Sequence, residues 1–535
     1  MSATPPADLR HPGVHARDNG GKPAIIMADS GQTLSYATLE TRSCQLAHLL
    51  RARGLSPGDH AAVLLGNEPA YLEACWAAQR AGLYLTPVNT HLTASEAGYI
   101  IADCGARALI AGGPAGALLP EMEPVISTVP VRLAVGDPLP GFDLYQDAIA
   151  DYPGSPLPDE TEGCLMLYSS GTTGKPKGVI RPLSGVPFGA GETELSTLLQ
   201  LMYGIGGSSV YLSPAPLYHA APLRWIMASH RIGGTVVVME RFDAAATLRA
   251  IERYRVTHAQ FVPTHFVRML KLPDKLRESF DTSSLQRVVH TAAPCPAEVK
   301  RAIMGWWGPI VHEYYAGSES NGFCTIGPAE WLAHPGSVGR PLVSTVHILG
   351  ESGDELGPGQ TGTVWFGNGP VFRYHNDPER TARAFNDRGW STLGDVGHVD
   401  EEGYLYLTGR ASDMIIRGGV NIHPREIEDI LVMHPEVEDV AVIGVPDFEL
   451  GERVAAVVQP AHRGRAGPEL AAQLMAFCAA RAARFKCPES VEFVTELPRL
   501  PTGKLLKRAL RKDGGGRDGG PGAVTHAQRA QEAGR

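Results

Sequence analysis

The chain has 535 residues, 43% of them hydrophobic, and its formal net charge at pH 7 is −9. This length predicts two or more globular domains, because one hydrophobic core rarely extends beyond about 250–300 residues. The negative charge disfavours non-specific binding to nucleic acid, so a polyanionic ligand would need basic groups in its own pocket.

The N-terminus and the cysteines indicate the compartment. Residues 1–20 contain no apolar stretch typical of a secretory signal, and no uncharged apolar run is long enough to span a bilayer. The eight cysteines form no CxxC pair and no zinc-binding spacing, which favours reduced, buried thiols. We expect a cytoplasmic protein without a transmembrane segment. The sequence leaves the oligomeric state open, with a homodimer as one alternative.

Strand and helix patterns alternate from residue 33 onward. Helices are expected at residues 36–50, 71–81 and 94–104, the last opening with the capping box Thr93-x-x-Glu96. Strands are expected at residues 60–65, 84–88 and 107–110. Such alternation is typical of a doubly wound, largely parallel sheet. Residues from about 120 to 160 are rich in Pro, Asp and Gly, and this composition predicts a connector.

The apolar residues 164–168 lead into the stretch Tyr168-Ser-Ser-Gly-Thr-Thr-Gly-Lys-Pro-Lys-Gly178. Its glycines let successive backbone N–H groups turn toward one anion, while its hydroxyls add donors and its lysines add positive charge. A Walker loop is disfavoured, because two residues rather than four separate the first two glycines and Pro176 follows Lys175. The stretch therefore predicts a triphosphate cradle, with a glycine-rich surface hairpin as the alternative.

A second run of strands and helices follows. Strands are expected at residues 209–212, 235–239 and 258–262, and helices at 223–232 and 243–254, the latter capped by Asp243. From residue 336 to about 409, short segments broken by Gly, Asp and Asn predict a β-rich subdomain.

The C-terminal part has enough elements for a small α+β domain. Helices are expected at residues 424–433 and 468–484, and strands at 440–444, 453–458 and 490–494. From residue 513 the chain is polar and rich in glycine, which predicts a disordered tail.

Several later segments carry residues suited to chemistry. His312-Glu-Tyr-Tyr-Ala-Gly-Ser-Glu319 places an aromatic ring, a hydroxyl and a carboxylate after a mostly apolar run, which predicts a strand-end loop or a decorated turn. Gly389-Trp-Ser-Thr-Leu-Gly-Asp395 ends in a carboxylate that could accept from both ribose hydroxyls or cap a turn. Leu407-Thr-Gly-Arg410, the segment 409–428 and Leu497-Pro-Arg-Leu-Pro-Thr-Gly-Lys504 follow. Alone, Lys504 would be a solvated charge.

In this order, the segments resemble the motifs of the adenylate-forming superfamily, which includes acyl-CoA synthetases, luciferases and the adenylation domains of peptide synthetases. The resemblance covers most of residues 30–510, and residues 168–178 are similar to the superfamily's phosphate-binding loop. The chain departs from the usual pattern at four positions, which are Ala316 for Gly, Ser318 for Thr, Leu393 for Thr, and Ser412 for the hinge Asp or Lys.

The resemblance implies a role for individual residues. ATP would be bound at its phosphates by Ser169, Ser170, Gly171, Thr172, Thr173, Gly174 and Lys177, at adenine by Ala293, Pro294 and Tyr315, and at ribose by Asp395 and Arg410. Mg²⁺ would be held by Thr172 and Glu319. The catalytic residues would be Lys504, Glu319 and Ser318, with Lys504 bridging the acyl carboxylate and the α-phosphate. Gly418 and Gly419 would approach coenzyme A, Ser412 would be the hinge, and His219, Ala316 and Gly317 would border the acyl pocket.

The implied fold is α/β. Residues 1–409 would form a large AMP-binding domain of two doubly wound α/β subdomains plus the β-rich subdomain. Residues 410–512 would form a small mobile α+β domain, and residues 513–535 the disordered tail.

The implied activity is that of an ATP-dependent acyl-CoA synthetase. A carboxylic acid would react with ATP to give acyl-AMP and pyrophosphate, and CoA would then displace AMP. An amino acid is disfavoured as substrate, because residues 220–225 contain no acidic partner for its amine. The Ala, Pro, Trp, His and Tyr residues of the expected pocket suit an apolar acid, either fatty or bulky alicyclic or aromatic.

Other activities fit the sequence less well. An acyl-AMP ligase that loads a carrier protein would be expected to carry an extra segment near the hinge, and residues 409–428 contain none. An inactive nucleotide-binding homologue is disfavoured because Lys504 and Glu319 are both present. Nothing in the sequence indicates a luciferase-like oxygenase.

Overall fold

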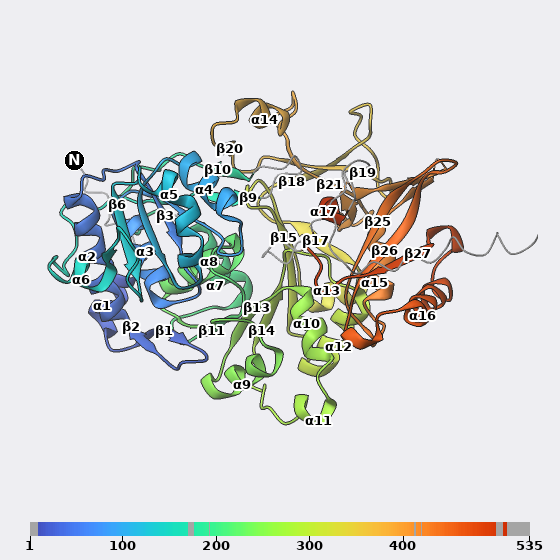
Figure 1. Ribbon diagram of the computed structural model, residues 1–535, viewed down its shortest axis with the longest axis horizontal. Helices are drawn as coiled ribbons and strands as arrows, with labels where there is room; N and C mark the ends of the chain where they lie inside the picture. The colour runs from blue at the N-terminus through green and yellow to red at the C-terminus, as the bar shows by residue number, and fades with distance from the viewer. Residues whose placement is uncertain are drawn as a thin grey trace, which may run out of the picture.

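The computed structural model describes residues 9–169, 176–191, 193–410, 413–418, 420–498, 505 and 507–510 (Figure 1). The predicted tail from residue 513 lies outside the described residues. None of the described helices has the length and apolarity that a membrane crossing requires.

The first sheet has six parallel strands in the order β7-β6-β5-β3-β4-β8. The strands are β3 (His60–Leu64), β4 (Tyr84–Pro87), β5 (Ala106–Gly112), β6 (Val131–Val135), β7 (Asp143–Leu144) and β8 (Cys164–Leu165). The helices are α2 (Tyr36–Ala52), α3 (Pro69–Arg80), α4 (Ala94–Asp103), α5 (Leu119–Ile126) and α6 (Tyr145–Ala150). The predicted strand and helix alternation is confirmed, and Thr93 and Glu96 form the predicted capping box of α4.

The predicted connector at residues 120–160 is wrong in large part. This region contains most of α5 and all of β6, β7 and α6. Val131 and Leu133 of β6 are buried, and β6 pairs in parallel with β5. Pro and Gly dominate the composition around this short apolar run, so composition alone hid a strand that tertiary pairing stabilises.

The second sheet has thirteen strands in the order β18-β19-β21-β22-β17-β16-β15-β14-β13-β11-β12-β1-β2. The strands are β1 (Pro23–Met27), β2 (Thr33–Ser35), β11 (Val210–Ser213), β12 (Thr235–Val238), β13 (His258–Phe261), β14 (Arg287–His290), β15 (Val311–Ala316), β16 (Phe323–Ile326), β17 (Ser337–Pro341), β18 (Thr345–Leu349), β19 (Gly362–Gly367), β21 (Ser391–Val399) and β22 (Leu405–Arg410). From β12 to β15 the strands are parallel, and from β16 to β18 they are antiparallel. The β-rich part thus continues the same sheet.

Helices connect and flank these strands. They are α1 (Pro12–Asn19), α7 (Glu194–Tyr203), α8 (Ala220–Ile232), α9 (Ala244–Tyr254), α10 (Pro263–Leu270), α11 (Asp274–Arg277), α12 (Ala297–Trp307), α13 (Pro328–Ala333) and α14 (Pro378–Arg383). As predicted, Asp243 caps α9 by accepting from the backbone N–H of Ala246 at 2.7 Å.

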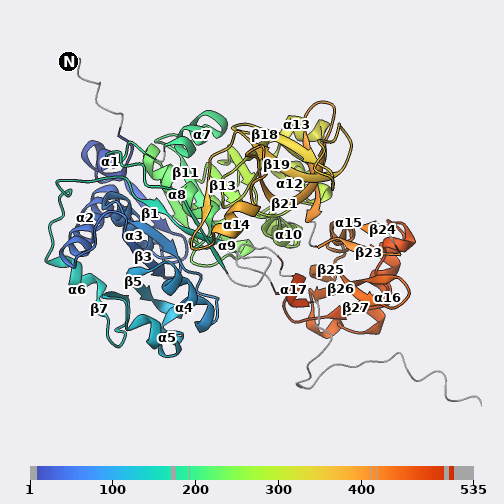
Figure 2. The same ribbon diagram turned by 90° about the horizontal axis from the view of Figure 1, so that it is seen from above.

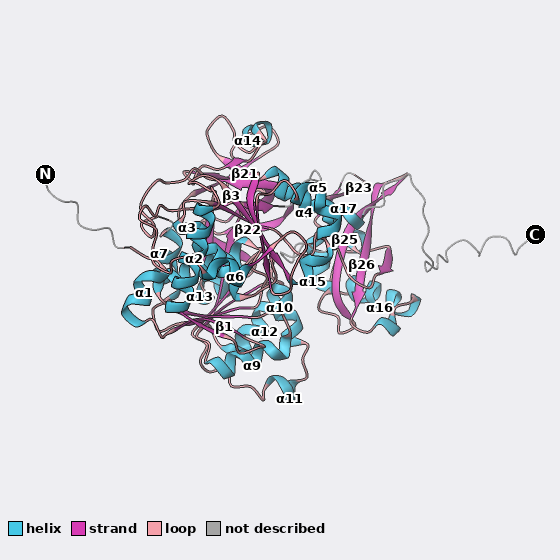
Figure 3. Ribbon diagram, turned by 60° about the vertical axis from the view of Figure 1, so that its left-hand side comes forward, coloured by secondary structure: helices cyan, strands magenta, loops and turns pink. Residues whose placement is uncertain are grey.

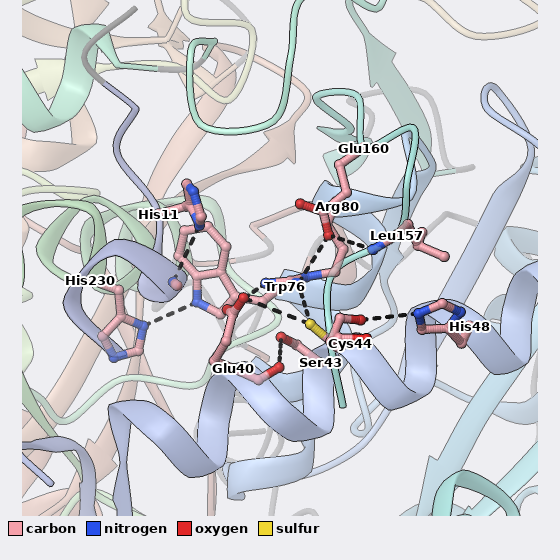
Figure 4. A network of polar contacts seen from close by, with 12 residues as sticks. His11, Glu40, Ser43, Cys44, His48, Trp76, Arg80, Leu157, Glu160 and His230 are labelled. Atoms are coloured by element: carbon pink, nitrogen blue, oxygen red, sulfur yellow. Dashed lines mark hydrogen bonds and ion pairs between the residues drawn. The ribbon is translucent and has the colours of Figure 1, made fainter. Parts of the chain in front are cut away.

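A buried polar network joins the helices of the first sheet to the second sheet (Figure 4). Arg80 of α3 is fully buried and pairs with Glu40 of α2 at 2.5 Å and with Glu160 at 3.0 Å. Trp76 Nε1 donates to Nδ1 of His230 on α8 at 3.2 Å. Burial lowers the pKa of His230 to about 4, so this ring is neutral and can accept at Nδ1. The hydrogen bond between Trp76 and His230 therefore connects a helix of the first sheet to a helix of the second sheet.

A small antiparallel sheet, β20-β10-β9, lies beside the first two. Its strands are β9 (Leu167–Ser169), β10 (Lys177–Ile180) and β20 (Arg373–Tyr374). Strands β9 and β10 contain the first and the last residues of the glycine-rich stretch 168–178, so the positions of these strands fix its two ends.

The C-terminal residues form a five-stranded sheet of their own, which Figures 1 and 2 show beside the rest of the chain. Its strands are β23 (Ile415–Arg417), β24 (Val420–Ile422), β25 (Val437–Asp447), β26 (Gly451–Pro460) and β27 (Ser490–Phe493), and its helices are α15 (Pro424–Leu431), α16 (Pro468–Ala479) and α17 (Lys507–Leu510). Figure 3 shows α15 and α16 beside the long strands β25 and β26. Helix α16 ends at Ala479, five residues before the predicted end.

Candidate active site

A cavity of about 2490 Å³ lies where β9 and β10 meet the C-terminal ends of β13 and β15, strands β21 and β22, and helix α15. The predicted site residues that line it are Ser169, Lys177, His219, Ala293, Pro294, Tyr315, Ala316, Gly317, Ser318, Glu319, Asp395 and Arg410. Gly418 does not line it and forms the turn between β23 and β24, with a φ of 57°. The other predicted residues lie outside the described residues, and they are Ser170, Gly171, Thr172, Thr173, Gly174, Ser412, Gly419 and Lys504.

Lys177, Tyr374 and Glu319 form a polar group on the side of the cavity bounded by β20, β10 and β9. Tyr374 donates its phenol hydrogen to Glu319 Oε1 at 2.9 Å, and Lys177 Nζ lies 4.6 Å from the centre of the Tyr374 ring. Burial lowers the pKa of Lys177, Arg380 and Arg410 lower it further, and Glu319 opposes them. These three cations give the cavity the local positive charge that a polyphosphate would need in a chain of net charge −9.

Two donors hold the carboxylate of Asp395, which also lines the cavity. Tyr315 donates to Asp395 Oδ2 at 2.5 Å, and Arg410 Nε lies 3.2 Å from Oδ1. Asp395 and Arg410 are direct partners in the antiparallel pair β21 and β22, so their side chains share one face. Burial and the Asp395 carboxylate raise the pKa of Tyr315, so its phenol stays protonated and donates. A carboxylate fixed in this way can accept hydrogen bonds from two neighbouring hydroxyls.

A side chain at Gly317 would meet the ends of two neighbouring side chains. A Cβ atom at this position would lie 2.6 Å from Leu393 Cδ1 and 3.0 Å from Glu319 Oε2. Strand β15 ends at Ala316, so Gly317 is the first residue of the loop that carries Ser318 and Glu319. The small residue lets this loop approach the turn before Asp395 closely.

The loop at residues 291–296 borders the cavity, and the buried Glu313 carboxylate contacts one residue before the loop and one residue after it. Glu313 Oε2 lies 2.7 Å from Lys300 Nζ, which follows the loop on α12, and 3.3 Å from His290 Nε2, which precedes it. Burial alone would raise the pKa of Glu313, but His290 and Lys300 outweigh it and lower the pKa to about 2. Ala292 within the loop has a φ of 74°, which a residue with a side chain rarely adopts. The contacts of Glu313 hold this strained loop, and with it Ala293 and Pro294, against the cavity.

Aromatic rings form another wall of the cavity. Trp225 of α8 stacks on Tyr314 of β15 with 5.6 Å between ring centres, and Tyr314 stacks on Phe323 of β16 at 5.0 Å. Gln260 Nε2 donates to the Tyr314 hydroxyl at 3.1 Å, which fixes the middle ring. His219, the N-cap residue of α8, also lines the cavity. This wall offers flat apolar surface to a bound group.

Sequence reasoning missed the roles of Tyr374, Lys300 and Glu313. Tyr374 and Glu319 are 55 residues apart, and no local spacing connects them. One signal was available for Glu313, which closely follows the mostly apolar run Trp306 to Val311, because a carboxylate is almost never fully buried without a partner. The identity of that partner depends on the packing of α12 against β15.

The residues of this site suit Mg²⁺ only if phosphate oxygens of a bound ligand complete its coordination. Within the part of the chain that the structure describes, no group of three or more His, Cys, Asp or Glu side chains could hold a metal ion. Mg²⁺ commonly uses one or two carboxylates together with phosphate oxygens and water. Glu319 supplies one buried carboxylate near the cationic Lys177, which matches that pattern.

Two family models match the chain. The model described as "AMP-binding enzyme" matches residues 14–374, and the one described as "AMP-binding enzyme C-terminal domain" matches residues 426–504. Feruloyl-CoA synthase from an Amycolatopsis species is 35% identical over 91% of this chain and 96% of its own length. Long-chain-fatty-acid–CoA ligase FadD13 from Mycobacterium tuberculosis is 31% identical over 91% of this chain and 95% of its own. The crystal structure of ATP-bound MatB from Rhodopseudomonas palustris has a TM-score of 0.77 and 28% identity, covering 94% of this chain and 98% of that one.

Proposed function

Because this chain belongs to the AMP-binding enzyme family, in its branch of AMP-forming acid–CoA ligases, we propose that it converts an apolar carboxylic acid into its CoA thioester at the expense of ATP. The acid is fatty, or bulky and alicyclic or aromatic. By their names, one of the two similar ligases reported above makes feruloyl-CoA, an aromatic thioester, and the other acts on long-chain fatty acids. The aromatic wall of Trp225, Tyr314 and Phe323 and the lack of an acidic residue in 220–225 support an apolar acid.

The observation that carries this proposal is the convergence of four charged residues on one cavity. Lys177 and Glu319 line it beside β10, and Asp395 and Arg410 line it beside β22. In the proposed complex, Lys177 and residues 169–174 bind the phosphates of ATP, and Asp395 and Arg410 bind the ribose. Tyr315, which contacts Asp395, lies with Ala293 and Pro294 against the adenine.

In the first half-reaction, a carboxylate oxygen of the acid bonds to the α-phosphorus of ATP. The bond from that phosphorus to the bridging oxygen breaks, and pyrophosphate leaves with the electron pair. Lys177 stabilises the leaving phosphates, and Ser318 and Glu319 lie beside them. We assign the bridge between the acyl carboxylate and the α-phosphate to Lys504, which lies outside the described residues. Mg²⁺, bound with ATP through Glu319 and Thr172, would neutralise phosphate charge.

In the second half-reaction, the thiolate of CoA attacks the acyl carbonyl and AMP leaves. We assign residues 410–512 to a domain that reorients between the two steps about Ser412, with Gly418 and Gly419 near the pantetheine arm. Among the described residues, Val432 and Met433 pack against the core of the large domain, and Lys271 donates to the carbonyl of Val437. Two further polar contacts join this part to the rest of the chain. Arg268 Nε lies 2.9 Å from Glu438 Oε1, and Arg425 Nη1 donates to the carbonyl of Leu407 at 2.8 Å. The Arg268–Glu438 pair is exposed and therefore of modest strength, which suits a reversible docking.

A cytoplasmic location accords with the cysteines, because all eight lie among the described residues, are buried, and are not joined in disulfides. The homodimer stays a prediction.

The test is a panel of acids in an assay for AMP release that depends on both ATP and CoA. The panel should include fatty acids of graded length, cinnamic and benzoic acids, an alicyclic acid and an amino acid. Thioester formation with one or more apolar acids and none with the amino acid is expected. Acyl-AMP without any thioester would instead favour the ligase that loads a carrier protein, and no ATP consumption with any acid would favour the inactive nucleotide-binding homologue.

A further inference from the structure

Asp103, the last residue of α4, contacts strand β9 and the two residues that follow strand β20. Its carboxylate Oδ2 accepts a hydrogen bond from the hydroxyl of Tyr168 on β9 at 2.5 Å. Its backbone carbonyl accepts from His375 Nε2 at 3.0 Å and from Asn376 Nδ2 at 3.2 Å, just after β20. One residue therefore ties β9 and the end of β20 to the same helix terminus.

These contacts lie next to Lys177 and Tyr374 in the same small sheet, and Tyr168 itself lines the cavity. Tyr168 is the strand partner of Gly178, and the backbone N–H of His375 donates to the Gly178 carbonyl at 2.8 Å. A Cβ atom on Gly178 would lie 3.0 Å from Tyr168 Cζ and 3.2 Å from His375 Cβ, so both side chains flank that face of the sheet. Successive residues of a strand point to opposite faces, so Lys177 and Tyr374 point the other way, toward Glu319 and the cavity.

The Tyr168 contact is suited to holding a strand in place. Burial raises the pKa of Tyr168, and the Asp103 carboxylate raises it further, so the phenol keeps its proton and donates. Hydrogen bonds to an ionised acceptor are shorter and about twice as strong as neutral ones. A side chain that must meet a charged ligand needs its supporting strand fixed to within about 0.5 Å, because small misplacements weaken binding steeply.

We propose that Asp103 is a positioning residue for nucleotide binding, whose carboxylate acts through Tyr168 and Asn376 to hold Lys177 and Tyr374 in register with Glu319. Asp103 is not among the residues that line the cavity, so it acts without touching the ligand. The inference rests on the proposed function, because it assigns the phosphates of ATP to Lys177.

The experiment compares five variants of the full-length protein, which are four single variants and the double variant Asp103→Ala with Tyr168→Phe. Asp103→Ala and Tyr168→Phe each remove the contact, Asp103→Asn keeps an acceptor oxygen, and Thr93→Ala weakens the other end of α4 without touching β9 or β20. The Kd for a non-hydrolysable ATP analogue with Mg²⁺ is measured by calorimetry, and the KM for ATP and for the acid by AMP release. Thermal midpoints are recorded for all variants.

Asp103→Ala and Tyr168→Phe are expected to raise Kd and KM for ATP by about 10-fold or more, as the loss of a charged hydrogen bond implies. The KM for the acid should stay unchanged in both variants, and Asp103→Asn should recover much of the ATP affinity. The double variant Asp103→Ala with Tyr168→Phe should raise the Kd for ATP no more than the single variant with the larger effect. Thr93→Ala should lower the thermal midpoint without changing the Kd for ATP.

Two outcomes would overturn the inference. The first is an unchanged Kd for ATP in Asp103→Ala. The second is a loss of ATP affinity in Thr93→Ala equal to that in Asp103→Ala, which would mean that the Asp103–Tyr168 contact only stabilises α4. Failure of the proposed function is distinguishable from both, because the wild-type protein would then bind the ATP analogue and form no thioester.

Discussion

Tyr315 donates a 2.5 Å hydrogen bond to Asp395, which stands 80 residues further along the chain. Arg410 approaches the other oxygen of the same carboxylate. Strands β15, β21 and β22 thereby meet at one acceptor group before any ligand arrives. Preorganisation of this kind reduces the cost of ordering the site when a nucleotide binds.

Asp395→Ala should raise the KM for ATP by about 100-fold, because two charge-assisted hydrogen bonds to the ribose would be lost. The KM for the acid should stay within about twofold of wild type, since the change lies on the nucleotide side. Steady-state AMP release with varied ATP measures both constants. Tyr315→Phe is the matched control, and it should cost less because Arg410 still holds the carboxylate. Equal effects of the two changes would mean that Asp395 acts only through Tyr315.

Glu319→Gln should lower kcat at saturating Mg²⁺ by about 100-fold, because the only ionised oxygen ligand that we assign from this loop would become a neutral amide. Tyr374→Phe leaves the carboxylate in place and removes its 2.9 Å hydrogen bond, so it should chiefly raise the Mg²⁺ concentration for half-maximal rate. ATP–pyrophosphate exchange at varied Mg²⁺ separates the two effects. A Glu319→Gln protein with wild-type exchange would remove Glu319 from the metal site.

The sequence predicted the family and most of the elements because both depend on local patterns. The capping box at Thr93 and the N-cap at Asp243 are confirmed, and so is membership of the adenylate-forming superfamily. The α/β fold with a small C-terminal domain is confirmed as well. Residues 120–160 were misjudged because the pairing of β6 with β5 overrides a Pro- and Gly-rich composition.

The sequence alone could not predict contacts between segments that lie far apart along the chain. Motif residues such as Glu319 could be picked out from their neighbours, whereas Tyr374 and Lys300 could not, because their partners are brought to them by sheet topology. Likewise, nothing in the local sequence around Asp103 connects it to Tyr168, 65 residues away. The roles of the site residues therefore stay predictions, which the experiments proposed for them would test.

Gly317→Ala should reduce adenylation, because the added Cβ would lie 2.6 Å from Leu393 Cδ1 and 3.0 Å from Glu319 Oε2, so the ends of both side chains must shift. A shift of the loop by a few tenths of an ångström displaces the Glu319 carboxylate, and misplacement on this scale is expected to cost at least about 10-fold in rate. Adenylation is measured by ATP–pyrophosphate exchange. The double variant Gly317→Ala with Leu393→Ala restores space and should recover part of the rate. No recovery would mean that Gly317 is required for a reason other than its contact with Leu393.

Lys300→Met should destabilise the protein at pH 7 by about 3–5 kcal/mol, because it removes the 2.7 Å partner of the buried Glu313 carboxylate. The pKa of Glu313 is lowered from 4.5 to about 2 in the folded state, so its ionised form stabilises the fold above pH 4.5. That contribution is lost as pH falls toward 2. The difference between wild type and Lys300→Met should therefore shrink below pH 4.5, as chemical denaturation at several pH values would show.

The matched control is the double variant Lys300→Met with Glu313→Gln, which removes both charges. It should be more stable at neutral pH than Lys300→Met alone, because no buried carboxylate is left without its ammonium partner. A double variant that is less stable than the single one would show that Glu313 is held mainly by His290.

ATP affinity should depend on pH through Lys177. Burial lowers the pKa of Lys177 below its ordinary value of 10.5, so the folded protein releases this proton at lower pH than the unfolded chain. Folding stability consequently rises with pH between the folded pKa and 10.5, where the unfolded chain binds more protons. Phosphate charge favours the ammonium form, so ATP should bind tightly below the folded pKa and more weakly as pH rises through it.

Calorimetric titration of a non-hydrolysable ATP analogue at several pH values up to about 10 measures this dependence. Lys177→Arg is the matched control, because a guanidinium stays charged over this range and should give a nearly constant affinity. Lys177→Met should bind weakly at every pH and should unfold at higher denaturant than wild type near neutral pH, since a partly buried ammonium is removed. If Lys177→Arg loses affinity over the same pH range as wild type, another group titrates, and Lys177 would not supply the charge that the phosphates meet.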